Sequence, residues 1–190
     1  MMILSGSPTL IAPSSMGYFT LARPSSVRTK IREALAFGIS TTIKKSNGYF
    51  LDVDEVHVNA PANDNGRNKF PSVDIIWGRE RYTNNVRGGN SLGGYNKVAM
   101  VILDWHLHEK KCAYTPEEIV SLREQAVADT EKYFGTWYGI PDDAGVHTAF
   151  NCIVTNNTPW GIEATEPKGG VTIELEVYYR IELTNPTQTF

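Results

Sequence analysis

The stretch that decides the fold is Gly170–Leu183, which reads Gly-Val-Thr-Ile-Glu-Leu-Glu-Val-Tyr-Tyr-Arg-Ile-Glu-Leu. Apolar residues occupy every second position of this stretch, at Val171, Ile173, Leu175, Val177, Tyr179, Ile181 and Leu183. Because successive side chains of a strand point to opposite faces, this period of two predicts a long β-strand with one buried face. A helix would scatter the same residues around its circumference. We therefore expect the other segments to pack against this strand.

The composition is that of a globular protein. The chain has 190 residues, of which 41% are apolar, enough for one domain with a hydrophobic core. Its formal net charge of −3 does not provide the clustered basic surface typical of nucleic-acid-binding proteins. Cys112 and Cys152 form no Cys-x-x-Cys pair and are interpreted as free thiols in a reducing compartment. The sequence shows neither a membrane-spanning run nor a secretory signal at its start, which predicts a soluble protein made in the cytoplasm.

Working outward from the final strand, residues 25–190 are expected to form a single α+β domain. Its mixed or antiparallel sheet of about five strands is flanked by two helices. The first helix begins after Ser25 or Ser26 and fades near Ile43. The second begins with a capping box formed by Thr115 and Glu118 and ends near Gly135. Strands are expected at residues 49–58 (with a bulge), 73–77, 98–107, about 147–155 and 170–183. Apolar residues on both faces of the 98–107 strand predict that it is covered on both sides, and residues 156–161 are expected to be a loop.

Two segments fit no regular element. Residues 1–24 contain three prolines and an irregular set of apolar residues, so we interpret them as an extended arm that docks on its own domain or on a neighbouring protein. Residues 78–97 are expected to be a loop, and a loop of that length inside a domain is usually functional. The arm and the loop supply the candidate assembly contacts, which are Leu10, Ile11, Tyr18, Phe19, Arg79, Arg81, Tyr82, Arg87, Tyr95 and Lys97.

The basic residues of this loop could contact phosphate groups or an acidic protein surface, and the near-neutral net charge favours the protein surface. The glycine-rich run 88–97 carries Tyr95 where a phosphate-binding loop needs lysine, and no helix follows it. Glu174, Glu176 and Glu182 make the polar face of the final strand acidic. We interpret that face either as solvated or as the wall of a channel from which it would repel DNA.

A possible metal site is formed by Asp104, His106 and His108, which alternate along one strand and so share a face. Two imidazoles and a carboxylate could bind zinc or iron. The alternative is that the strand simply turns polar where it leaves the core, and no second ligand motif accompanies these residues. No nucleophile motif appears either, so we expect no catalytic residue, metal or cofactor.

Taken in order, four segments resemble the tail terminators of tailed bacteriophages. They are the capped helix at Ser26–Leu35, the strand entered through a proline at Phe70–Glu80, the hydrophobic strand Val98–Leu107, and the final strand Gly169–Arg180 with its aromatic-arginine ending. The resemblance covers about residues 25–184, and the arm and the 78–97 loop depart from it.

The resemblance implies a structural virion protein of the tail and neck, assembled in the host cytoplasm. Such a protein forms a ring, expected to be a homohexamer, that caps the tail tube and joins the tail to the head connector proteins. Its partners would be its own copies, the tail tube and connector proteins, and could include sheath proteins. DNA would only pass through the channel, and no membrane is involved. The alternatives are another neck component, such as a connector adaptor or head–tail joining protein, or a metal-dependent enzyme built on Asp104, His106 and His108.

Overall fold

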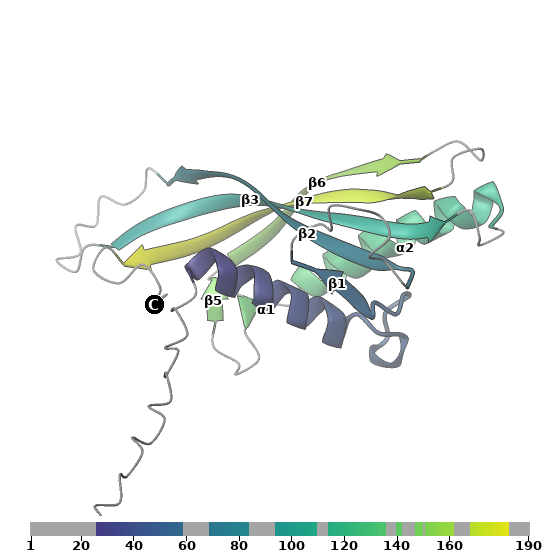
Figure 1. The fold of residues 1–190 in the computed structure, drawn as a ribbon, viewed down its shortest axis with the longest axis horizontal. Coiled ribbons are helices and arrows are strands. Elements are labelled where there is room, and N and C mark those ends of the chain that lie inside the picture. Colours follow the sequence, from purple (N-terminus) through teal and green to yellow (C-terminus); the bar gives the residue numbers. More distant parts are fainter. Residues whose placement is uncertain are drawn as a thin grey trace, which may run out of the picture.

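A computed structural model describes residues 26–58, 69–83, 94–109, 114–135, 140–141, 147–149, 151–161 and 168–182. Its elements are arranged as one five-stranded sheet with two helices and a small two-stranded sheet (Figure 1). In chain order they are α1 (Val27–Thr42), the 3-10 helix η1 (Lys45–Asn47), β1 (Glu55–His57), β2 (Ser72–Tyr82), β3 (Gly94–Glu109), α2 (Pro116–Gly135), β4 (Ile140–Pro141), β5 (His147–Ala149), β6 (Asn151–Trp160) and β7 (Lys168–Glu182).

The large sheet has the strand order β1-β2-β3-β7-β6. β1 runs parallel to β2, and the other neighbouring strands are antiparallel, so the sheet is mixed. The expected single α+β domain, with about five strands and two helices, is confirmed. The strand predicted at 170–183 is β7, which lies between β3 and β6 and pairs with both along most of its length.

The alternation along β7 separates a buried face from a partly exposed face, as the sequence predicts. The residues at its odd positions, from Val171 to Tyr179, are almost fully buried, and those at its even positions are partly exposed. The buried residues join one core with the odd-numbered residues of β3, of which Trp105 is the largest. Burial of this apolar set supplies the main favourable free energy of folding.

Both helices pack on this same face of the sheet (Figure 1). α1 contributes a stripe that includes Ile31 and Leu35, and α2 contributes Ala126 and Tyr133. The predicted caps form. The Ser26 side chain accepts a hydrogen bond from the Thr29 N–H at 3.2 Å. In the capping box of α2, the Thr115 N–H donates to Glu118 Oε2 at 2.7 Å, and the Glu118 N–H donates to Thr115 Oγ1 at 3.3 Å.

The prediction of a strand over residues 49–58 is wrong except at β1. The backbone N–H groups of Phe50 and Leu51 donate instead to the buried carboxylate of Asp129 on α2, at 2.9 Å for the closest oxygen of each. The Val53 N–H donates to the carbonyl of Ile43 at the end of α1. These bonds tie the segment to the two helices, because its backbone donors are used there rather than in a sheet ladder.

Three further expectations are corrected. β2 continues to Tyr82 through an irregularity after Trp77, and β3 already begins at Gly94, so both ends of the expected 78–97 loop are strand, while residues 84–93 lie outside the described residues. β6 continues to Trp160, although residues 156–161 were expected to be a loop. β3 was expected to be covered on both sides, but among the described residues the helices cover only one of its faces. Local sequence propensity did not predict these strand extensions, because pairing with a long neighbouring strand stabilises them more than local propensity opposes them.

Candidate interaction surfaces

The sheet face opposite the helices is open in the described part of the chain. It carries the even-numbered side chains of β7, including Glu174 and Glu176, together with Met100 and Ile102 of β3. Two isoleucines on this face are substantially exposed, Ile76 at 37% and Ile153 at 43%. A sheet face that mixes exposed apolar and charged side chains is suited to contact another protein.

Arginines of β2 lie beside the carboxylates of β7 on this open face. Arg81 Nη2 lies 2.7 Å from Glu176 Oε1, and the Tyr178 hydroxyl donates to Glu176 Oε2 at 2.8 Å. The hydrogen bond to Glu176 raises the pKa of Tyr178 above its usual range. A cavity of about 290 Å³ here is lined by Arg79, Arg81, Val98, Met100, Thr155, Glu174 and Glu176. The arginines predicted as assembly contacts and the glutamates predicted as a channel wall therefore form one mixed-charge surface.

A second charged cluster surrounds Glu80, on the face that the helices cover. Glu80 Oε1 accepts hydrogen bonds from the Tyr179 hydroxyl at 2.6 Å and from Trp77 Nε1 at 2.9 Å. Arg28 of α1 lies 2.5 Å from the same oxygen, and Lys97 Nζ lies 3.3 Å from Oε2. Burial raises the pKa of Glu80, but the hydrogen bonds from Tyr179, Arg28 and Trp77 outweigh it and lower the pKa to about 2. The cluster fixes the start of α1 to the sheet.

Asp104 and His106 lie near one end of the open face. His106 Nε2 lies 3.3 Å from Asp74 Oδ2 and 3.5 Å from Asp104 Oδ2. The other oxygen of Asp104 accepts hydrogen bonds from Trp160 Nε1 at 2.9 Å and from Thr172 Oγ1 at 3.0 Å. A cavity of about 420 Å³ adjoins these side chains.

The contacts of His106 do not support the metal site suggested for Asp104, His106 and His108. A metal site needs several ligand atoms directed at one point, whereas the imidazole nitrogen of His106 faces the carboxylates of Asp74 and Asp104 themselves. Over the residues that the structure describes, no group of three or more histidine, cysteine, aspartate or glutamate side chains is placed to hold a metal ion. The third proposed ligand, His108, follows a register shift in β3, and its side chain lies outside the described part.

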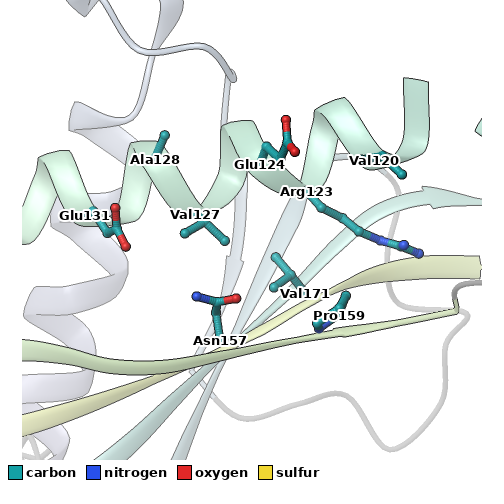
Figure 2. Close-up of a pocket in the computed structure, with 9 residues that line it drawn as sticks. All are labelled: Val120, Arg123, Glu124, Val127, Ala128, Glu131, Asn157, Pro159 and Val171. Carbon is teal, nitrogen blue, oxygen red and sulfur yellow. The ribbon is translucent and has the colours of Figure 1, made fainter. Parts of the chain in front are cut away.

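A groove runs between α2 and the edge strand β6 (Figure 2). It has a volume of about 440 Å³ and is lined by Val120, Arg123, Glu124, Val127, Ala128, Glu131, Asn157, Pro159 and Val171. In Figure 2, Val127 points from the helix toward Asn157 on β6, and Val171 and Pro159 lie beside them.

Arg123 connects the two walls of the groove. Its Nη2 donates to the carbonyl oxygens of Trp160 at 2.9 Å and Gly161 at 2.5 Å. Its side chain therefore links the middle of α2 to the end of β6, and the walls are held at a fixed separation. This groove could not be predicted from the sequence, because an arginine in a helical polar pattern is normally solvent-exposed.

The other candidate contacts are placed as follows. Tyr82 is 64% exposed, and Lys97 Nζ lies 5.0 Å from the centre of its ring. Leu10, Ile11, Tyr18, Phe19 and Arg87 lie outside the described residues, as do the side chains of Tyr95 and Glu182.

Sequence reasoning missed Glu80, Arg123 and Asp129, each of which holds an α-helix to another part of the fold. In the sequence, Glu80 stands between Arg79 and Arg81 and reads as part of a solvated charge run. The irregularity in β2 turns it toward the helices, and a pattern of period two cannot predict that turn.

One finding concerns membranes: none of the helices in the described ranges is long and apolar enough to span one.

Comparison of the chain with protein-family models and with curated proteins gave no match.

Proposed function

We propose that this chain is a structural subunit of a tailed-bacteriophage tail, a tail terminator whose copies form a ring that caps the tail tube. The observation that carries the proposal is the one-sided sheet. Its helices cover one face, while the opposite face is left open over the described residues and presents both apolar and charged side chains. The resemblance of the segment order to tail terminators supplies the identity of the assembly.

A ring of identical subunits needs heterologous contacts, in which one patch of a subunit meets a different patch of the next. The described part of the fold offers two such patches, the open face and the groove beside α2, and we propose residues 1–24 as a third contact segment. If the open face lines the channel, Glu174 and Glu176 would place carboxylates near the passing DNA and limit its adhesion, with Arg81 balancing part of their charge. We propose a hexamer because six-fold rings are what the resemblance implies.

The experiment that tests this function is electron microscopy of phage tails assembled with and without the chain. With it, tails should have a uniform length and carry an extra ring at the end that meets the head. Without it, tubes should vary in length and fail to join heads. Tails of normal length that join heads in its absence would refute the proposal. Binding of the purified protein to connector complexes but not to tail tubes would instead indicate another neck component.

A further inference from the structure

The groove between α2 and β6 has the properties of a binding site for an extended peptide. Val120 on its wall is 51% exposed, and Val127, Pro159 and Val171 continue the apolar lining. Asn157 lies on the β6 wall, and its amide can both donate to and accept from a peptide backbone (Figure 2). Because Arg123 bonds the carbonyl oxygens of Trp160 and Gly161, the groove is preformed, and ordering its walls costs little free energy on binding.

The charge of the groove favours a cationic or neutral peptide. Glu124 and Glu131 lie along the helix wall, and both are exposed. The guanidinium of Arg123 is directed at backbone carbonyls. The rim of the groove is therefore acidic.

Residues 1–24 match this groove. The segment contains no acidic residue and one basic residue, Arg23. Its apolar residues include the adjacent pairs Leu10-Ile11 and Tyr18-Phe19, which could fill the apolar lining. Burial of such apolar side chains against another surface is stabilising.

The start of α1 and the groove lie toward different ends of the sheet. α1, which follows the segment, is held at Arg28 to Glu80 beside Tyr179, whereas Val171 lines the groove. Tyr179 and Val171 lie eight residues apart on β7, about 26 Å at the rise of a strand. Figure 1 shows α1 and α2 beginning at opposite ends of the sheet. A donor at one end and an acceptor at the other form the pair of patches that a head-to-tail contact requires.

We propose that residues 1–24 of one copy bind in the α2–β6 groove of the next copy and link the subunits of the ring. This inference rests on the proposed function for the ring, while the contact itself can be tested separately. The groove then acts as the acceptor of every subunit, and the segment as the donor.

The test is photo-crosslinking in the full-length chain. A photoreactive phenylalanine analogue replaces Phe19, unlabelled and 15N-labelled protein are mixed, and crosslinked peptides are identified by mass spectrometry. The expected result is crosslinks of mixed isotope composition between residue 19 and residues 120–131 or 157–159. Crosslinks to the groove within one chain only, or crosslinks to other surfaces, would overturn the inference.

Two matched variants sharpen the test. Val120→Glu places a carboxylate in the groove, and Phe37→Glu places one at a 46% exposed position of α1 outside it. Val120→Glu should raise the protein concentration for half-assembly by about tenfold, the effect of 1.4 kcal/mol, and Phe37→Glu should leave it unchanged. Equal effects of the two variants would contradict the inference. Mixed crosslinks in a protein that caps no tails would refute the proposed function alone, and tail capping with crosslinks elsewhere would refute the groove alone.

Discussion

Replacing Glu80 with glutamine should lower the free energy of unfolding by about 2 kcal/mol at pH 7. Glutamine keeps the shape of the side chain and can still accept hydrogen bonds from Tyr179 and Trp77. It removes the negative charge that Arg28 and Lys97 approach. The change therefore isolates the charge of the cluster from its packing.

The magnitude follows from the pKa of Glu80, which is lowered from 4.5 to about 2. A shift of this size corresponds to roughly 3 kcal/mol, and solvent screening around the exposed Arg28 side chain reduces it to about 2 kcal/mol. Because the pKa is lower in the folded state, this stabilisation is complete above the unfolded pKa and is lost as the pH falls toward 2. The difference between the wild type and Glu80→Gln should shrink over that range.

The assay is urea unfolding followed by tryptophan fluorescence, at several pH values from 7 to 2.5 and at two protein concentrations, so that assembly is separated from folding. Glu33→Gln, at an exposed position of α1, is the matched control and should change the free energy of unfolding by less than about 0.5 kcal/mol. A Glu80→Gln effect below about 0.5 kcal/mol at pH 7, or one that does not change with pH, would refute the reasoning.

Three other outcomes are expected. Gly170→Ala should cost about 3 kcal/mol or prevent folding, because the added Cβ would overlap the carbonyl oxygen of Trp105; an unchanged melting temperature would contradict this. Asp129→Ala should cost about 3 kcal/mol in urea unfolding, because the buried N–H of Leu51 and the partly buried N–H of Phe50 lose their acceptor, and Asp129→Asn should cost less. A loss equal to that of an exposed aspartate would contradict the assigned role. Metal analysis of the purified protein should find substoichiometric zinc and iron, and His106→Ala should not alter it; one metal per chain that His106→Ala removes would support an enzyme instead.

The fold was predictable from the sequence where periodicity is strong. The alternation of β7 and the capping box of α2 both involve residues close in sequence, so their consequences are local and appear as predicted. The strand expected over residues 49–58 failed because the Asp129 carboxylate, far along the chain, takes the backbone donors of Phe50 and Leu51. No local sequence pattern predicts that contact.

The candidate surfaces were predictable only as lists of residue types. Arg81 and Glu176 could be named from the sequence, but their pairing depends on the order of β2, β3 and β7 in the sheet. The groove beside α2 depends on Arg123, whose hydrogen bonds to Trp160 and Gly161 join α2 to the end of β6. These residues are far apart in the sequence, so no local periodicity predicts the contact. Such features require the tertiary arrangement.

The most direct test of the ring is the mass of the purified full-length protein, measured by native mass spectrometry and by light scattering across a range of concentrations. The account predicts a discrete species of six chains, each of 21.1 kDa, and a ring in end-on electron micrographs. A protein that remains monomeric at every concentration, also when tail tubes are present, would contradict it.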